Sequence, residues 1–260
     1  ASEAYFAHPG IAVFVSAGDD GYNDGGQGPD YPATSANVIA VGGTSLTKTT
    51  GGRGWTETAW SSGGSACSLS IPKPAYQTGT MCQYKATTDI AAVGDPNTGV
   101  AVYNQANGGW GVIGGTSASA PLIAAIFAAT GNGNQTSGTF VMQNAAKMYD
   151  VTSGTNGACG NILCRAGTGW DGPTGYGTPN ASAIVANNTG TGGGSDSGTG
   201  NGDGTGNGDG TGNGGGQSGT GGAGTSSGDV VGGCAAGGSG AGLGVLLALG
   251  AVVTRRRRSV

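Results

Sequence analysis

Continuous apolar runs separated by polar, glycine-rich stretches mark the first 187 residues. Residues 11–16 and 38–41 are almost entirely apolar rather than alternating, as expected for strands that are buried on both faces of a parallel sheet. The shorter segments 90–93 and 99–103 are also typical of strands. The pattern therefore predicts a sheet built from short, buried strands.

Helices are expected between these strands. Residues 118–130 are apolar almost throughout, which predicts a helix that is buried on most sides and ended by Gly131. Residues 140–149 are expected to form a second, amphipathic helix, and residues 2–8 the end of another that stops before Pro9. Strands that alternate with helices indicate an α/β domain.

Residues 188–228 have a different composition. They contain 20 of the 60 glycines of the chain, and the rest are almost all Thr, Ser, Asn and Asp. Such a segment cannot bury enough apolar surface to offset its chain entropy, so we expect a flexible linker. Gly-Asp repeats also occur in calcium-binding β-rolls, but the large apolar residue that each coil needs is missing here. We therefore divide the chain into a folded domain (1–187), a linker (188–228) and a tail (229–260).

The tail joins an uncharged stretch to a cluster of basic residues. Residues 234–253 carry no charge, and residues 255–258 are all Arg. This order predicts a short transmembrane stretch with the arginines in the cytoplasm. Together with the linker and Cys234 it resembles the MYXO-CTERM class of bacterial sorting signals, which implies that Cys234 is the anchoring site and that sorting machinery processes the tail. A plain C-terminal membrane anchor is the alternative. Both interpretations place an exported domain at the cell surface, outside the cytoplasmic membrane.

The folded domain is acidic. Residues 1–187 hold 10 Asp and Glu against 6 Lys and Arg, with no basic cluster. A nucleic-acid partner needs a basic surface, so this composition argues against one.

Four of the five cysteines form two local pairs in the folded domain. None has the CxxC spacing of a zinc or redox site, and disulfides joining Cys67 to Cys82 and Cys159 to Cys164 are the economical interpretation. Disulfides imply an exported protein. Four buried thiols are the alternative.

The segment 114–121, Gly-Gly-Thr-Ser-Ala-Ser-Ala-Pro, opens the apolar helix. Free N–H groups and the positive end of the helix dipole suit an attacking oxygen and the oxyanion that it creates. For an isolated residue, a simple N-cap at Ser117 or Thr116 is the alternative. The complete motif resembles that of the subtilisin-like clan, and specifically of the sedolisin family of serine-carboxyl peptidases. This resemblance implies that Ser117 is the nucleophile.

Other blocks resemble the same family in the same order. Residues 5–19 are similar to the segment that ends in the oxyanion-hole aspartate, which implies that role for Asp19. Residues 31–44, 95–99 and 150–179 match later blocks. The resemblance covers residues 1–187 and implies a subtilisin-like, three-layer α/β fold with a mostly parallel sheet that here lacks its N-terminal part.

The role of Asp19 requires a proton on its carboxyl group. An aspartate in a glycine-rich turn is usually there for the turn itself. Asp19, however, follows a strand that we expect to be buried, where α/β sheets carry their sites. Burial would raise its pKa, and acidic pH would keep it protonated, so that it can donate to an oxyanion.

A calcium site is the second expectation. The two carboxylates and closely spaced carbonyls of the segment 150–171 are hard oxygen ligands of the kind that Ca²⁺ prefers, although Gly-x-Gly-x-Asp alone is more often a plain turn. The resemblance to sedolisins implies one Ca²⁺ ion, bound by the side chains of Asp150 and Asp171 and the carbonyls of Val151, Gly167 and Gly169.

A base for Ser117 is missing from the sequence. His8 lies in a turn, without the setting of a subtilisin histidine. Sedolisins use a Glu and an Asp four residues apart, but here Glu3 and Glu57 are followed at that spacing by Ala and Ser. In the family this pair lies upstream of the Asp19 segment, so we expect the sequence to be the C-terminal part of a catalytic domain and inactive alone.

The resemblance implies a serine-carboxyl endopeptidase or tripeptidyl-type peptidase that acts on proteins or peptides at acidic pH. An inactive pseudo-peptidase that serves as a surface-displayed binding or structural module is the alternative. A subtilisin-type enzyme that takes its His from outside this chain would act near neutral pH. Asp19 disfavours this third hypothesis, because that family has an amide side chain there.

Overall fold

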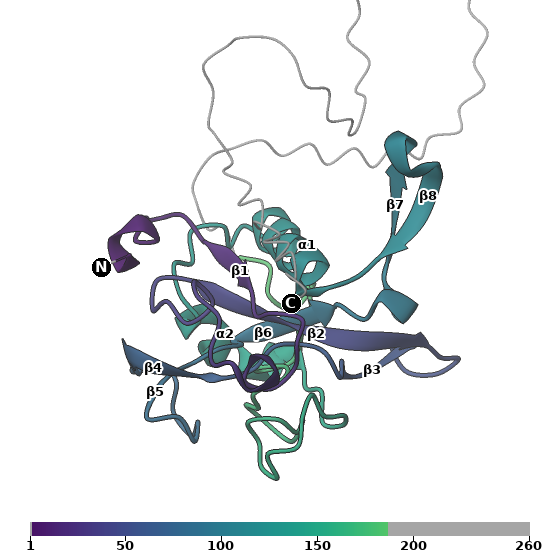
Figure 1. Cartoon of the computed structure of the whole chain (residues 1–260). Helices are drawn as coiled ribbons and strands as arrows, with labels where there is room; N and C mark the ends of the chain where they lie inside the picture. The colour runs from purple at the N-terminus through teal and green to yellow at the C-terminus, as the bar shows by residue number, and fades with distance from the viewer. Residues whose placement is uncertain (1, 187–260) are drawn as a thin grey trace, which may run out of the picture. The chain divides into compact units, whose positions relative to one another are not determined.

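A sheet of four strands forms the centre of the structure, a computed structural model in which residues 2–186 are described (Figure 1). The long strand β2 (Ile39–Lys48) pairs with the other three. It runs parallel to β1 (Phe14–Ser16) and β6 (Ile90–Val93), and antiparallel to β3 (Trp55–Ala59). The expected α/β fold with a mostly parallel sheet is confirmed.

Smaller elements surround this sheet. Three two-stranded sheets are formed by β4 (Cys67–Pro72) with β5 (Tyr84–Ala86), β7 (Val100–Asn104) with β8 (Gly109–Ile113), and β9 (Met148–Tyr149) with β10 (Thr178–Pro179). The α-helices are α1 (Thr116–Ala129) and α2 (Thr139–Gln143). Single 3-10 turns are η1 (Glu3–Tyr5), η2 (Asp24–Gly26), η3 (Pro96–Thr98), η4 (Gln105–Asn107) and η5 (Ala145–Lys147).

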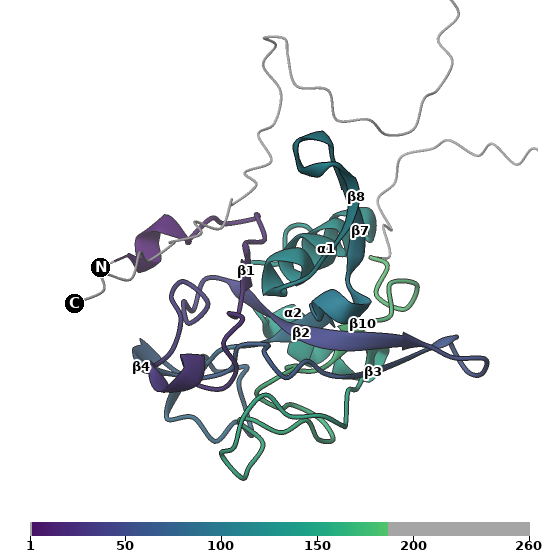
Figure 2. The ribbon, with the colours of Figure 1, turned by 45° about the vertical axis from the view of Figure 1, so that its right-hand side comes forward.

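Helix α1 covers one face of the central sheet (Figures 1 and 2). Its side chains Ile123 and Phe127 are fully buried. The Phe127 ring packs edge-to-face against Phe14, with the ring centroids 5.0 Å apart. Ile39 and Ile90 of the strands join the same apolar core. Each such side chain contributes about 1.5–3 kcal/mol when it is fully buried, so this layer anchors the helix that carries Ser117.

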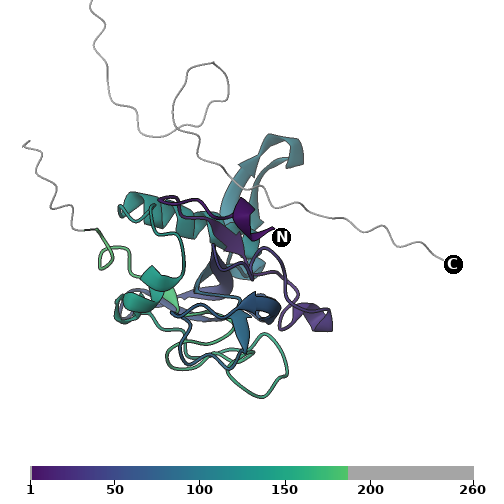
Figure 3. The same cartoon turned by 90° about the vertical axis from the view of Figure 1, so that its left-hand side faces the viewer.

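The segment 150–177 lies on the opposite face of the sheet (Figures 1 and 3). Successive residues of a strand point to opposite faces of the sheet, so the neighbouring glycines Gly42 and Gly43 of β2 face different sides. A Cβ atom at Gly42 would collide with the Pro173 carbonyl, and one at Gly43 would lie 2.7 Å from the Trp60 side chain. Glycine at position 42 therefore lets the segment 150–177 approach the sheet closely, and glycine at position 43 makes room for Trp60.

The start of α1 is fixed at the carboxyl end of β6. The Gly115 N–H donates to the Gly94 carbonyl at 2.6 Å, and the Ser119 hydroxyl donates to the Val93 carbonyl at 3.0 Å. The chain that leaves β1 reaches the same edge, because β1 and β6 both run parallel to β2. This edge is where α/β sheets place their sites.

The strand expected at residues 11–16 is shorter and less buried than the sequence suggested. Only Phe14–Ser16 pair with β2, all three are half-buried, and Ile11 is 60% exposed. Within residues 2–186, β1 has no second strand on its other edge. The expectation of burial on both faces is therefore wrong for this strand. The next strand is longer than expected, since β2 continues to Lys48 by pairing with β3.

The helix expected at residues 140–149 is wrong over most of its length. Helix α2 ends at Gln143, and Asn144 leaves the helical conformation with φ −110° and ψ 20° while its side-chain amide donates to the Phe140 carbonyl at 2.9 Å. An amide that bonds the backbone in this way competes with helix continuation. The helix end expected at residues 2–8 is also reduced, to the single turn η1.

Both expected disulfides are present. Cys67–Cys82 ties β4 to the loop before β5, and Cys159–Cys164 closes a short loop in the layer opposite α1.

Membrane anchoring is not addressed by the described part of the chain. Among residues 2–186, the structure contains no helix with the length and apolarity needed to cross a bilayer. The expected linker (188–228), the transmembrane stretch and Cys234 lie outside the described residues.

Candidate active site

Ser117 lies on the surface at the start of α1. It is the second residue of the helix and is exposed, whereas its neighbour Thr116 is only 1% exposed. Within residues 2–186 its hydroxyl has no hydrogen-bond partner, so it is free to react. Among the first N–H groups of the helix, that of Thr116 donates to Asp19 and that of Ala118 donates to the Gly115 carbonyl. The Ser117 N–H is the one left without a partner among the described residues, and a helix start of this kind can bind developing negative charge.

Asp19 reaches the start of the same helix from the chain that follows β1. Its Oδ1 atom accepts hydrogen bonds from the Thr116 N–H at 2.7 Å and from the Thr116 hydroxyl at 2.9 Å. Its Oδ2 atom would lie 2.8 Å from a Cβ atom at Gly115, whose φ of 92° also favours glycine. The fold thus brings the carboxyl of Asp19 to Thr116, the residue directly before Ser117, although 97 residues separate Asp19 from Thr116.

Thr116 is a positioning residue that the sequence did not single out beyond a possible N-cap. Its hydroxyl accepts a hydrogen bond from the Gly18 N–H at 3.1 Å and lies 3.1 Å from the Gly18 carbonyl, in addition to its contact with Asp19. The residue before the exposed serine therefore fixes the Asp19 loop against the helix. No local sequence pattern identifies this role, because the contact joins residues 98 apart.

The side chain of Asp19 is exposed, which differs from the buried position that the sequence suggested. Asp20, Asp24 and Asp30 lie in the same glycine-rich loop. Asp30 lies against Gly18, and the pKa of Asp30 is raised by partial burial and then by the charges of Asp24, Asp20 and Asp19. A group of carboxylates holds protons at higher pH than an isolated one, because each charge disfavours the next.

An apolar groove of about 380 Å³ begins at Ser117. One wall is the hairpin of β7 and β8, which projects from the sheet beside α1 (Figures 1 and 2). The other wall is the exposed side of α1. Apart from Ser117, its lining is apolar: Val100, Val102, Ile113, Gly114, Ala118, Pro121 and Leu122.

The two glutamates and the histidine are engaged elsewhere. His8 Nε2 lies 2.9 Å from the Tyr5 carbonyl of its own turn. Glu3 accepts from the Ser35 hydroxyl at 2.8 Å. Glu57 accepts from the hydroxyls of Thr44 at 2.8 Å and Thr178 at 2.6 Å. Within the described residues, none of the three is hydrogen-bonded to Ser117.

The carboxylates of the expected calcium site converge on one loop. The Gly167 N–H donates to Asp171 Oδ2 and the Gly169 N–H donates to Asp150 Oδ2, both at 2.9 Å. Asp171 is completely buried, whereas Asp150 is exposed. Val151, the remaining expected ligand, is buried directly after Asp150. All five expected ligands therefore belong to two short segments that touch.

Asp171 lies in an environment that disfavours its ionised form. Burial raises its pKa to about 7; the Gly167 and Thr174 hydrogen bonds oppose this shift, and the Asp150 charge adds to it. A cation between Asp150 and Asp171 would stabilise the ionised form of both carboxyl groups. Two carboxylates with nearby carbonyls match the oxygen donors that Ca²⁺ prefers. Within residues 2–186 no group of three or more His, Cys, Asp or Glu side chains is placed to hold a metal. A site here would therefore depend on backbone carbonyls and water.

Comparisons with known proteins agree with this geometry. The model of the subtilase family matches residues 2–202. Sedolisin from Pseudomonas sp. (strain 101) is 33% identical over 210 residues, which cover 69% of this chain and 35% of sedolisin. Kumamolisin from Bacillus sp. (strain MN-32) is 35% identical over 198 residues, covering 65% of this chain and 35% of kumamolisin.

A solved structure gives the same relationship. Pseudomonas sedolisin, a serine-carboxyl proteinase in complex with two molecules of pseudo-iodotyrostatin, is 31% identical, with a TM-score of 0.61, over 71% of this chain and 57% of that one. The present chain spans about a third of the length of the curated relatives that it matches. The chain belongs to the subtilase family, as a homologue of the sedolisins over the domain that carries Ser117 and Asp19.

Proposed function

We propose that this chain is part of a serine-type peptidase that cleaves proteins or peptides, with Ser117 as its nucleophile. The observation that carries the proposal is the exposed Ser117 hydroxyl at the start of α1, directly after the contact between Thr116 and Asp19. Related proteins with the names sedolisin, kumamolisin and tripeptidyl-peptidase support the assignment to peptidases.

In this mechanism the Ser117 Oγ attacks the carbonyl carbon of the scissile peptide bond. The Ser117 N–H at the start of α1 and a protonated Asp19 donate hydrogen bonds to the oxyanion that forms. Asp19 Oδ1 already accepts from Thr116, which leaves Oδ2 to carry the proton that is donated. Acidic pH supplies this proton.

The base that takes the proton of Ser117 is proposed to be a Glu and Asp pair on an upstream segment. A carboxylate pair remains a usable base in acid, where a histidine would be protonated. The apolar groove along α1 is a suitable place for that segment. Such a helix, which carries no charged side chain, is normally covered on most sides, and the groove leads directly to Ser117.

A first test compares residues 1–260 with a protein that also contains the upstream pair. We expect residues 1–260 alone to hydrolyse a peptide substrate several orders of magnitude more slowly, because an unassisted serine hydroxyl is a poor nucleophile. Rapid labelling of Ser117 in the isolated chain by a serine-directed covalent inhibitor would contradict this expectation. The intact mass of the native protein, from cell-surface extracts, shows whether an upstream segment is attached to the 24.7 kDa chain.

Asp19 gives a second prediction in the complete peptidase. Asp19→Ala is expected to lower kcat about 10²-fold, the usual effect of removing one oxyanion donor. Asp19→Asn is expected to recover activity at a higher pH than the wild type, because an amide donates without needing a proton. The pH profile of kcat/KM measures both effects. An unchanged acid optimum in Asp19→Asn would show that Asp19 does not set the pH dependence.

We also propose one bound Ca²⁺ ion, with side-chain ligands from Asp150 and Asp171 and carbonyl ligands from Val151, Gly167 and Gly169. The ion would neutralise the two carboxylates and stabilise the loop that covers the sheet opposite α1. The contacts between this loop and the two carboxylates support the proposal.

The metal-free protein should show the titration of Asp171. Its pKa is about 7 in the folded state against 3.8 ordinarily, so its contribution to stability is fully present below about pH 4 and lost as the pH rises through 7. We expect the free energy of unfolding to fall by about 2 kcal/mol between pH 5 and 7 relative to Asp171→Asn, and calcium to restore it. Thermal unfolding with chelator and with calcium measures this. A melting temperature that is indifferent to calcium in both proteins would exclude the site.

The alternative function is a pseudo-peptidase that serves as a surface-displayed binding or structural module. The observation in its favour is that Ser117 has no base among residues 2–186. A native chain of about 24.7 kDa that folds with calcium and cleaves nothing would support it. In either case we propose an exported protein, anchored at the cell surface through the tail that contains Cys234.

A further inference from the structure

The hairpin of β7 and β8 has two apolar faces, of which only one belongs to the groove at Ser117. Three of its side chains line that groove. Successive residues of a strand point to opposite faces, so the residues between them lie on the other side of the hairpin. We call this side the outer face; it consists of two directly paired sets of residues, Ala101 with Val112 and Tyr103 with Trp110.

The outer face is widely open to solvent. Trp110 is 76% exposed, Val112 62% and Tyr103 59%. The Tyr103 and Trp110 rings pack edge-to-face, with their centroids 5.5 Å apart. The hairpin projects from the rest of the domain beside α1 (Figures 1 and 2). A contiguous apolar cluster of this kind, unlike a single exposed apolar residue, indicates an interaction surface.

No charge accompanies this surface. Residues 96–146, which include the whole hairpin and all of α1, contain no Asp, Glu, Lys, Arg or His. A partner that is held by ion pairs is therefore a poor match. Transfer of the hairpin tip into an apolar environment requires no charged side chain to lose its water.

Upstream strands of a complete peptidase would lie on another side of the domain. Val41 of β2 pairs with Ser16 of β1 and with Ile90 of β6, so β1 and β6 lie on opposite sides of β2. Within residues 2–186, β1 has a free outer edge to which a preceding strand would add. The hairpin follows β6 in the chain, and it lies on the other side of α1 from β1 (Figures 1 and 2).

The size of the outer face favours a lipid surface over a second copy of the chain. Its exposed side chains offer about 400 Å² of apolar surface, whereas each partner in a stable dimer buries about 800 Å². Insertion among lipid head groups needs no complementary protein surface. Trp and Tyr are the residues that are enriched at membrane–water interfaces, because their rings are apolar with one polar group.

The length of chain between the domain and the tail allows such a contact. Glycine-rich chains as long as residues 187–242 have an end-to-end distance of about 40 Å. A folded domain of this size has a diameter of about 40 Å. If the tail is anchored in a membrane as proposed above, the outer face can therefore reach the same bilayer.

We propose that the outer face docks the domain on the surface of a lipid bilayer, with the rings of Trp110 and Tyr103 among the head groups. The proposed anchoring determines only which bilayer is used. Because the groove lies on the opposite face of the hairpin, docking leaves Ser117 accessible and holds it close to the membrane surface. The net negative charge of the domain gains nothing from anionic lipids, so zwitterionic lipids are sufficient.

Quenching of tryptophan fluorescence by brominated lipids tests the proposal with the complete 260-residue chain and without any need for catalysis. The chain is mixed with phosphatidylcholine vesicles whose acyl chains carry bromine, and with unbrominated vesicles as the reference. All four tryptophans precede residue 188, so the tail gives no signal. We expect quenching in the wild type and in Trp55→Phe, which removes the other exposed tryptophan, but none in Trp110→Phe.

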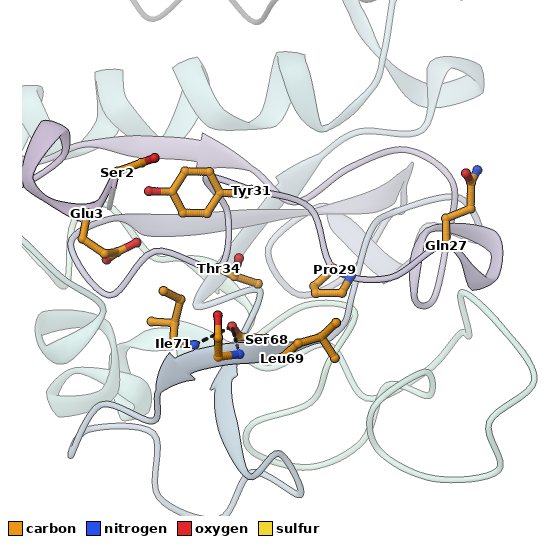
Figure 4. A pocket seen from close by; sticks show the side chains of 10 residues that line it. Ser2, Glu3, Gln27, Pro29, Tyr31, Thr34, Ser68, Leu69 and Ile71 are labelled. Atoms are coloured by element: carbon orange, nitrogen blue, oxygen red, sulfur yellow. Dashed lines mark hydrogen bonds between the residues drawn. The ribbon is translucent and has the colours of Figure 1, made fainter.

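Charge variants link the quenching to the outer face. Val112→Lys places a charge in the contact and is expected to lower the quenching at least tenfold. Leu69→Lys is the matched control, because Leu69 is 77% exposed in β4, far along the chain from the hairpin. Leu69 lines a separate pocket of about 420 Å³, where the Tyr31 hydroxyl points toward Glu3, its hydrogen-bond partner (Figure 4). Leu69→Lys should therefore be quenched like the wild type.

Flotation of the chain with the vesicles measures anchoring by the tail separately. A chain that floats without quenching of Trp110 would overturn the docking proposal and leave the anchor standing, and the outer face would then belong to a protein partner. Equal quenching in the wild type and Trp110→Phe, or equal loss in Val112→Lys and Leu69→Lys, would also overturn it. Peptidase activity does not enter any of these measurements.

Discussion

Replacing Ser117 with alanine in the complete peptidase is expected to lower kcat/KM about 10⁵-fold, because no other group in the groove offers a nucleophilic oxygen. The fold should be unaffected, since the Ser117 hydroxyl is exposed and makes no hydrogen bond within residues 2–186. Hydrolysis of a peptide substrate at acidic pH measures the change.

Ser119 provides a matched control for this substitution. It lies two residues further along α1, but its hydroxyl is buried and donates to the carbonyl of Val93 at 3.0 Å. Ser119→Ala should lower stability by about 1 kcal/mol and change kcat/KM by less than about tenfold. Substantial activity in Ser117→Ala, or an equal loss of activity in both variants, would refute the role of Ser117 as nucleophile.

The second large effect is expected at a buried ion pair. Lys85 and Asp89 are both inaccessible to solvent, and their side chains meet at 3.3 Å. Asp89 also accepts from the Ala40 N–H at 2.9 Å and from the Gln77 amide at 3.2 Å. Asp89→Asn keeps the volume but leaves the Lys85 ammonium without a counter-charge. We therefore expect the free energy of unfolding to fall by about 3–5 kcal/mol.

A double-mutant cycle separates the charge from the packing in this ion pair. Lys85→Met with Asp89→Asn removes both charges and is expected to recover most of the stability, because no buried charge is left alone. Lys73→Met makes the same change at an exposed lysine and should alter stability by less than about 0.5 kcal/mol. A loss below about 1 kcal/mol in Asp89→Asn, measured by urea unfolding, would mean that the pair does not stabilise the fold.

The sequence predicted those parts of the site that depend on contiguous residues. The apolar helix behind Ser117 and the Asp19 loop could be found because each motif is local, and the four local cysteines gave both disulfides. The predicted burial of Asp19 is wrong, because burial depends on which distant segments pack nearby. The sequence pattern of residues 140–149 is helical, but α2 ends early because the Asn144 side-chain amide bonds the Phe140 carbonyl.

Contacts between distant segments could not be read from the sequence. Glu3 was considered there only as a base, whereas its partners lie more than 30 residues away in the chain. The contact between Thr116 and Gly18 joins residues 98 apart. No local pattern encodes such pairs, because they follow from the register of β1 and β6 on β2.

The span between Asp19 and Thr116 also affects when the site can form. Closing so long a stretch of chain is a late event in folding, since the entropy of loop closure must be offset by pairing of all three parallel strands. A newly made chain therefore presents Ser117 long before Asp19 reaches the helix. In the peptidase proposed above, Ser117 would therefore be without Asp19 until the sheet is complete.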